Sequence, residues 1–410
     1  MSTSTDVAKA THELLDAWAT QPDGPVALRM KQTLLPVEES GVIFPPTYAD
    51  IGYSIDTLSD GTRVATIDSV GSQANRLEPI FKSESENTEA WLVPQIDIVI
   101  RKENCGVCDS CKDDAAAKKR KSDPCKKPHE VTRSLLDLAH RAADAVVQAS
   151  PTLLKQIAPA FKALQRGDAG PLCAIAPTSL IFGVWDSRGG TGEKRPRLVR
   201  SIIRAWDVEP LHGAAQYNSI WKLLDDGAQE ELKKEAKAKK AKLSEKGLAD
   251  APATFRKTKV PEYLNDAPNP EARVLGGVLV NGRIERDVTV NLVALRGLRG
   301  NDEKETDALR KYLLGLSLVA ATADIELFLR EGCLLRYAEN GDAWYQVPRR
   351  GEPTSVELTA KTAEEYANKA AAHFRSKWPA KGKALKHEFD LKAAKKLLGK
   401  KTVEEQESVE

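Results

Sequence analysis

The chain has few of the features that mark membrane, secreted or nucleotide-hydrolysing proteins. It contains no run of about 18 apolar residues, so a membrane-spanning helix is not expected. The first residues lack the basic and apolar blocks of a secretory signal. Neither a Walker-type phosphate loop nor a Rossmann glycine fingerprint occurs, which argues against ATP or NAD chemistry. We therefore expect a cytoplasmic protein that does not contact membranes.

The charge balance excludes a globally cationic nucleic-acid-binding protein. The 410 residues carry 61 Lys and Arg against 59 Asp and Glu, a formal net charge of +2. A local excess occurs in residues 188–204, where six Lys or Arg residues stand against the single acid Glu193. Such a cluster is either a solvated face or a surface that pairs with a phosphate backbone.

The order of expected elements indicates an α+β fold. Expected helices and strands alternate along the chain: helices over residues 6–21, 72–81, 131–165 and 309–323, and strands over 26–30, 41–44, 62–67, 180–186, 200–208, 273–279 and 287–295. We predict a core over residues 1–350 that carries two insertions. Residues 101–130 form a cysteine-rich insertion, and residues 228–270 form a lysine-rich arm with a proline-containing linker. A helical, basic C-terminal tail is expected over residues 351–410.

Residues 68–78 are the most informative part of the sequence. They follow an expected strand and hold Ser72, Gln73, Asn75 and Arg76, whose side chains can hydrogen-bond phosphates, sugars and base edges. A polar stretch placed after a strand is also typical of a turn into a capped helix. The residues alone leave both roles open.

Three short motifs carry a resemblance to a known family: residues 34–38 (LLPVE), 42–48 (VIFPPTY) and 68–76 (DSVGSQANR). Together they resemble the backbone subunit of type I-G (formerly I-U) CRISPR effector complexes, which belongs to the repeat-associated RNA-binding superfamily. The resemblance runs from about residue 14 to about residue 335. It implies an RRM-like (ferredoxin-like) antiparallel sheet core with large helical and loop insertions that form finger- and thumb-like arms.

The resemblance also implies a function in antiviral defence. Such subunits associate head to tail along a CRISPR guide RNA, together with other effector subunits, and present the guide for pairing with target DNA. Ser72, Gln73, Asn75 and Arg76 would then contact the RNA.

Four of the six cysteines are clustered: Cys105, Cys108, Cys111 and Cys125. Two-residue gaps allow successive thiolates to face one ion, and a fourth thiolate completes a tetrahedral set. Zinc is the first choice; an iron–sulfur cluster and unmetallated thiols are the alternatives, and His129 could replace one cysteine. Four protein ligands leave no open coordination position, so the ion would stabilise a loop and would not activate water.

A glycine-rich loop spans residues 187–195 and follows an expected strand. Gly192 is followed by Glu193, where a nucleotide-binding P-loop has Lys. The loop is either a plain connection or an RNA contact made by its backbone amides and by Arg188, Lys194 and Arg195. Arg299, between two glycines at the end of another expected strand, is a further candidate for contact with RNA.

Aromatic residues beside basic ones can stack on RNA bases. The candidates are Tyr48, Trp185, Trp206 and Tyr217. Trp is more often a core residue than a stacking platform, so Tyr48 is the one we favour.

No catalytic motif is evident. The six His residues are scattered, and none lies in an H-E-x-x-H or Cys–His motif. We expect a protein with no catalytic residues. Two alternatives remain: a zinc-stabilised RNA-processing nuclease that uses Asp68 or a nearby His, and an interaction scaffold that does not bind RNA.

Overall fold

The computed structural model describes residues 7–48, 51–101, 130–187, 191–213, 220–241, 274–379 and 384–398, with residues 243, 246 and 248. In these ranges the fold is α+β, as predicted. Among the described helices, none has the length and apolar character that crossing a membrane requires.

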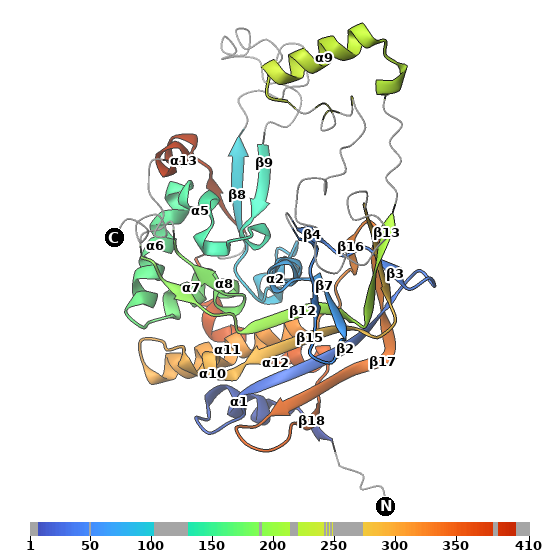
Figure 1. Ribbon diagram of the computed structural model, residues 1–410. Coiled ribbons are helices and arrows are strands. Elements are labelled where there is room, and N and C mark those ends of the chain that lie inside the picture. The colour runs from blue at the N-terminus through green and yellow to red at the C-terminus, as the bar shows by residue number, and fades with distance from the viewer. Residues whose placement is uncertain are drawn as a thin grey trace, which may run out of the picture.

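A nine-stranded sheet forms the centre of the described structure (Figure 1). All its neighbouring strands are antiparallel except the short β1–β18 pair. In sheet order the strands are β1 (Ala8–Lys9), β18 (Thr354–Glu357), β17 (Cys333–Val347), β2 (Ala27–Pro36), β15 (Ile284–Asn291), β12 (Val199–Trp206), β7 (Arg63–Asp68) and β6 (Ile55–Thr57), with β16 (Phe328–Arg330) also paired to β17.

Four smaller sheets surround the large one. Two have three strands: β13 (Val208–Gly213), β14 (Val274–Val280) and β3 (Val42–Ile43), and then β19 (Leu385–Glu388), β8 (Ile96–Arg101) and β9 (Glu130–Ser134). Two have two strands: β10 (Val184–Trp185) with β11 (Lys194–Arg195), and β4 (Thr47–Tyr48) with β5 (Gly52–Tyr53).

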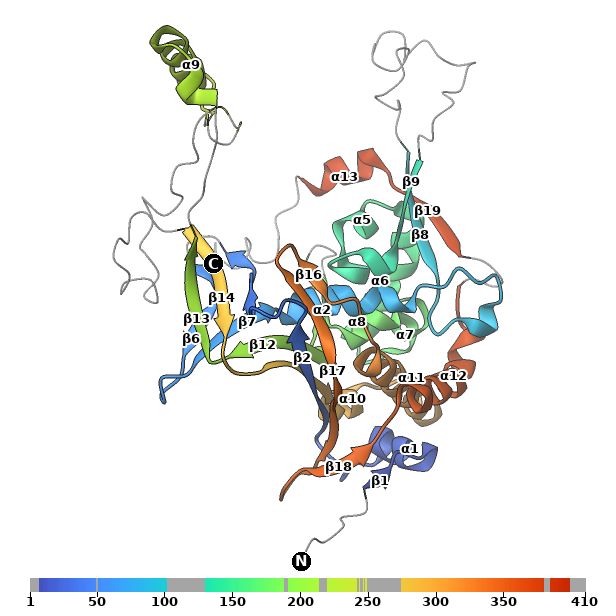
Figure 2. The same ribbon diagram turned by 90° about the vertical axis from the view of Figure 1, so that its right-hand side faces the viewer.

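Helices gather on one side of the central strands (Figure 2). They are α1 (His12–Thr20), α2 (Val70–Leu77), α5 (Ala145–Gln148), α6 (Pro151–Gln165), α7 (Gly170–Ile175), α8 (Pro177–Ile181), α10 (Leu292–Gly297), α11 (Glu303–Thr322) and α12 (Ala360–Arg375). Alternate residues of β2, from Leu28 to Leu34, are buried, as the period of two in a strand requires. Leu28 and Met30 pack in the core shared with the helices, whereas Leu34 packs in a second core formed by strand and loop residues. Two further helices are α13 (Leu391–Leu397) and α9 (Asp226–Ala238), and α9, within the predicted lysine-rich arm, has no buried residue.

A buried arginine crosses the interface between the sheet and this helical layer. Arg286, on β15, is 0% exposed, and burial lowers the pKa of its guanidinium. Its Nε donates to Ser201 Oγ (3.2 Å) and its Nη1 to Gln32 Oε1 (3.0 Å). The guanidinium also donates to the carbonyl oxygens of Ala320 and Ala323 at the end of α11 (3.5 and 3.2 Å). It therefore joins β12, β15 and β2 to that helix.

The hydrogen bonds continue across the sheet in both directions. Ser201 Oγ donates to Gln73 Oε1 (2.7 Å), and Gln73 Nε2 donates to Asp68 Oδ2 (2.6 Å). On the other side, Gln32 Nε2 donates to Asp342 Oδ2 (2.9 Å). We call these five side chains, with Arg286, the buried polar network; Asp342, at its outer end, is exposed. The network links five adjacent strands and α2.

Within the predicted C-terminal tail, the described residues 351–379 and 384–398 pair and pack with the main body. β18 pairs with both β17 and β1, and β19 pairs with β8. α12 packs on α11, where the ring of Phe374 stacks on that of Tyr312. Tyr366, also on α12, donates to Asp16 of α1 (2.8 Å).

One predicted strand is wrong. Residues 180–186 were expected to form a strand before the glycine-rich loop, but the structure has α8 up to Ile181 and only the two-residue strand β10. A short apolar run has the same pattern in a buried helix and in a buried strand, and Pro177 in the first turn favours the helix here.

Ser201→Ala tests the buried polar network. The substitution leaves Gln73 Oε1 and Arg286 Nε without this partner, so we expect the free energy of unfolding to fall by about 2 kcal/mol. Urea unfolding measures the change. Ser317→Ala is the matched control. Among the described residues this buried hydroxyl donates only to Leu313 O of its own helix, so its loss should change the value by less than about 0.5 kcal/mol. Equal values for both variants would contradict a role for the network.

Candidate nucleic-acid interface

α2 begins with a side-chain cap, in agreement with the interpretation of residues 68–78 as a turn into a capped helix. Ser69 Oγ accepts the backbone amide of Ser72 (3.3 Å). Gln73 is fully buried, and its side-chain amide is bonded to Asp68 and Ser201 in the buried polar network. Gln73 therefore has a role inside the protein and is not accessible to a ligand.

Arg76 also bonds within the protein. Its Nε donates to Asp68 Oδ2 (3.1 Å) and its Nη2 to the carbonyl oxygen of Leu329 (2.8 Å). Its side chain is 28% exposed, so part of it is accessible to a ligand. A contact between Arg76 and RNA therefore stays a prediction.

Asn75 faces away from the network, into a surface hollow of about 550 Å³. The hollow lies between α2 and the β10–β11 hairpin, and we call it the Trp185 hollow. It brings Asn75 next to Lys194 and Arg195, which the sequence predicted as a separate site. Its lining residues are Gly71, Asn75, Ala139, His140, Arg141, Gly183, Val184, Trp185, Ser187, Lys194, Arg195, Pro196 and Arg197.

The lining of the Trp185 hollow is cationic. It includes four Arg or Lys side chains and no carboxylate. Lys194 Nζ lies 5.3 Å from the ring centroid of Trp185, within cation–π range. Arg195 is partly neutralised by Glu193 (2.9 Å) and donates to the carbonyl oxygen of Leu164 (3.1 Å). The remaining charge favours an anionic ligand.

Arg141 is the deepest of these cations. It is 5% exposed, has a positive φ of 54°, and forms an ion pair with Glu78 on the 3-10 helix that follows α2, with Nε–Oε2 at 2.7 Å. Burial raises the pKa of the Glu78 carboxyl to about 7, against the attraction of Arg141. The same burial lowers the pKa of Arg141, and Glu78 opposes that shift.

Glycine is required at one wall of the Trp185 hollow. Gly183 has a φ of +82°, and a Cβ there would lie 2.9 Å from Arg197 Cγ. A side chain at position 183 would therefore be strained and would displace Arg197 from the hollow.

A second hollow of about 450 Å³ adjoins the first and shares Arg195 and Pro196 with it. We call it the Arg299 hollow. It lies between α6, α8 and α10, and no carboxylate lines it. Its lining residues are Leu164, Gly167, Ala169, Leu180, Arg195, Pro196, Leu198, Ala294, Gly297, Leu298 and Arg299.

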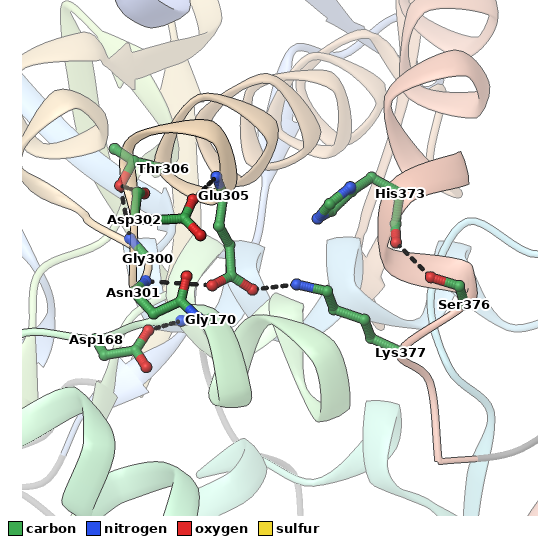
Figure 3. A network of polar contacts seen from close by, with 10 residues as sticks. All are labelled: Asp168, Gly170, Gly300, Asn301, Asp302, Glu305, Thr306, His373, Ser376 and Lys377. Atoms are coloured by element: carbon green, nitrogen blue, oxygen red, sulfur yellow. Dashed lines mark hydrogen bonds and ion pairs between the residues drawn. The ribbon is translucent and has the colours of Figure 1, made fainter.

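Bonds to the N-cap of α7 and to α11 hold the segment that carries Arg299 in place. Its carbonyl oxygen accepts the backbone amide of Ala169 (2.8 Å). Glu305 Oε2, on α11, accepts the amide of Asn301 (3.2 Å). Figure 3 shows the Glu305 carboxylate between this segment and Lys377, with which it forms an ion pair. These contacts fix where Arg299 emerges.

The structure thus brings together residues that the sequence predicted in three separate segments: Asn75, the pair Lys194 and Arg195, and Arg299. Ser72 is half-buried in the first turn of α2. Tyr48, the favoured stacking residue, is exposed on β4 and lines neither hollow. Arg188 and the four clustered cysteines, Cys105, Cys108, Cys111 and Cys125, lie outside the described residues.

Sequence reasoning missed Arg141 and Arg197. Arg197 belongs to the cationic cluster and could have been included on that ground. Arg141 gives no sequence signal, because its place depends on the fold. Within the described ranges, no group of three or more His, Cys, Asp or Glu residues could hold a metal ion.

Residues 28–210 match the family described as CRISPR-associated protein GSU0053, over slightly less than half of the chain. The match indicates a CRISPR-associated protein. It supports a role in a CRISPR system. A search of curated proteins finds no match.

The matched residues contain the whole of the Trp185 hollow, whose lining runs from Gly71 to Arg197. They also contain the three motifs that carried the resemblance. The Arg299 hollow is only partly included, since Arg299 lies beyond the match.

Glu78→Gln tests the raised pKa of the buried Glu78 carboxyl through the pH dependence of stability. Because the folded-state pKa of Glu78 is raised to about 7, its contribution to stability is fully present below its unfolded pKa and is lost as pH rises through 7. The variant lacks this loss. Between pH 5 and 8 we expect the stability of the wild type relative to the variant to fall by about 2–3 kcal/mol.

Urea unfolding at several pH values measures this difference. Glu364→Gln, at an exposed carboxylate of α12, is the control and should leave the pH dependence unchanged. Parallel profiles of stability against pH for the wild type and Glu78→Gln would contradict a raised pKa of Glu78 in the folded protein.

Proposed function

We propose that this chain is the non-catalytic backbone subunit of a CRISPR type I effector complex and binds guide RNA. The observation that carries the proposal is the pair of adjoining, carboxylate-free hollows, which collect Asn75, Lys194, Arg195 and Arg299 on one surface. The family match to residues 28–210 supports the CRISPR context.

The proposed mechanism is electrostatic. Exposed cations in the two hollows hold phosphates, and phosphate contacts carry no sequence information. The base edges that face outward remain free to pair with target DNA, so the guide and not the protein determines the sequence that is recognised. A protein that must accept any guide needs this arrangement.

The strand order supports an RRM-like core for this proposal. Four central strands lie in the order β17-β2-β15-β12, and all neighbours are antiparallel. Helices occur between β2 and β12 and again between β15 and β17. Numbered along the chain, this is the β-α-β-β-α-β arrangement with strand order 4-1-3-2 that ferredoxin-like folds share.

The proposal includes head-to-tail self-association along the RNA and contacts with other effector subunits in the cytoplasm. Head-to-tail contacts that do not close into a ring produce filaments. The nuclease alternative draws no support from Asp68, which is 1% exposed and bonded to Gln73 and Arg76. Binding of RNA would separate the proposal from the scaffold alternative.

We also propose a structural zinc ion held by Cys105, Cys108, Cys111 and Cys125. The purified chain should contain about one zinc, measured by mass spectrometry of the metal, and Cys108→Ser should lose most of it because the tetrahedral set is broken. Cys333→Ala is the control, since Cys333 is a buried free cysteine. Iron together with visible absorbance would show an iron–sulfur cluster in place of zinc. Absence of both metals would show that the thiols bind no metal.

Replacing Lys194, Arg197 and Arg299 by Ala together tests the RNA interface. We expect the affinity for single-stranded RNA to fall by at least ~10-fold and the slope of log K against log salt to decrease in magnitude by about 2, because three phosphate contacts are lost. Fluorescence anisotropy at several salt concentrations measures both. The control replaces the exposed Lys361, Lys369 and Lys396. Equal losses in both variants would contradict a localised interface.

A further inference from the structure

We propose that the Trp185 hollow holds a single RNA nucleotide whose base is unstacked from its neighbours and lies against the indole of Trp185, with its phosphate at Arg141 and Arg197. The inference rests on the proposed function and specifies how the RNA lies at one of its two hollows. It assigns a base contact to a surface that otherwise needs only phosphate contacts.

Trp185 is placed as a stacking surface would be. It is 37% exposed on a two-residue strand, although large aromatic side chains are usually well buried. The β10–β11 pairing sets it opposite Lys194, whose Nζ lies over the ring. An indole held by a short hairpin at the wall of a cationic hollow can stack on any base, because every base has a π face.

Arg141 has spare hydrogen-bonding capacity inside the hollow. Its Nε is held by Glu78, but in the described part of the chain its Nη atoms make only contacts of 3.4 Å, to the carbonyl oxygens of Ala139 and Gly183 and to Asn75 Oδ1. These are longer than typical N–H···O bonds, whereas guanidinium–phosphate bonds are short and often bidentate. A phosphate near Arg141 and Arg197 would therefore form better bonds than the ones it replaces.

Asn75 lies on the opposite wall from the hairpin. Among the described residues its side-chain nitrogen has no hydrogen-bond partner, while its Oδ1 accepts from Arg141. An amide N–H can donate to an acceptor on the pairing edge of each of the four bases. The volume of about 550 Å³ lies within the range of small-ligand pockets. The hollow thus offers a stacking surface, phosphate contacts and a base-edge contact in a space of nucleotide size. None of these contacts selects one base.

Photocrosslinking tests the position of the base. The full chain is bound to oligouridine that contains 5-iodouridine, irradiated, and the crosslinked residues are mapped by mass spectrometry. The chain has seven Trp residues, which serve as internal references. We expect the crosslink at Trp185. Crosslinks confined to other aromatic residues would overturn the proposal.

A binding cycle separates base stacking from phosphate contact. Trp185→Ala should weaken binding of oligouridine by ~10-fold and should not weaken binding of an abasic oligomer of the same length. Trp185→Phe should retain most of the affinity. Trp221→Ala is the matched control, since Lys233 Nζ lies 5.6 Å from the ring centroid of Trp221 outside both hollows.

The outcomes distinguish the inference from the proposed function. If the wild type binds RNA with steep salt dependence but Trp185→Ala affects oligouridine and the abasic oligomer equally, the hollow takes phosphate only and the inference fails while the function stands. If the wild type binds neither oligomer at low salt, both fail.

Discussion

The hydrogen bonds of the buried Arg286 guanidinium are the constraint on which the rest of the structure depends. A guanidinium removed from water is destabilising unless its donors are satisfied, and here Ser201, Gln32 and the last carbonyls of α11 accept from it. These partners come from two strands, β12 and β2, and from the end of α11. Through Ser201 and Gln73 the same network reaches the first turn of α2. The register of the sheet and the position of α2 are therefore fixed together, in a way that apolar packing alone would not specify.

The proposed RNA-binding surface follows from that placement. α2 presents Asn75 on one wall of the Trp185 hollow, and the β10–β11 hairpin presents Lys194 on the other. Beneath them, the Glu78–Arg141 ion pair places a cation deep in the wall, with one carboxylate behind it to hold its orientation. Arg195 connects this hollow to the one that carries Arg299. A continuous cationic surface thus arises from segments that are far apart in the chain.

Sequence reasoning predicted the elements whose pattern is local. The strands predicted over 26–30 and 62–67 and the helix predicted over 309–323 overlap β2, β7 and α11; the boundaries of β7 differ by one residue, and one end of β2 and of α11 differs by six. It also identified residues 68–76 as important but assigned Gln73 to RNA, because a polar side chain that completes a buried network has the same sequence appearance as one that faces a ligand. The Trp185 hollow could not be predicted, since Arg141 reaches it only through long-range packing and a positive φ. Tyr48 was favoured over Trp185 because Trp is more often a core residue. The exposure of this indole depends on the fold and has no signal in the sequence.

Hydrogen–deuterium exchange with and without RNA tests the central claim most directly, because it locates the RNA on the intact chain. The account predicts that oligouridine and oligoadenosine of equal length protect the same segments, namely α2, β10–β11 and the residues around Arg299, and to the same extent. Protection of other segments, or protection that depends on the base, would contradict a sequence-independent interface at these hollows.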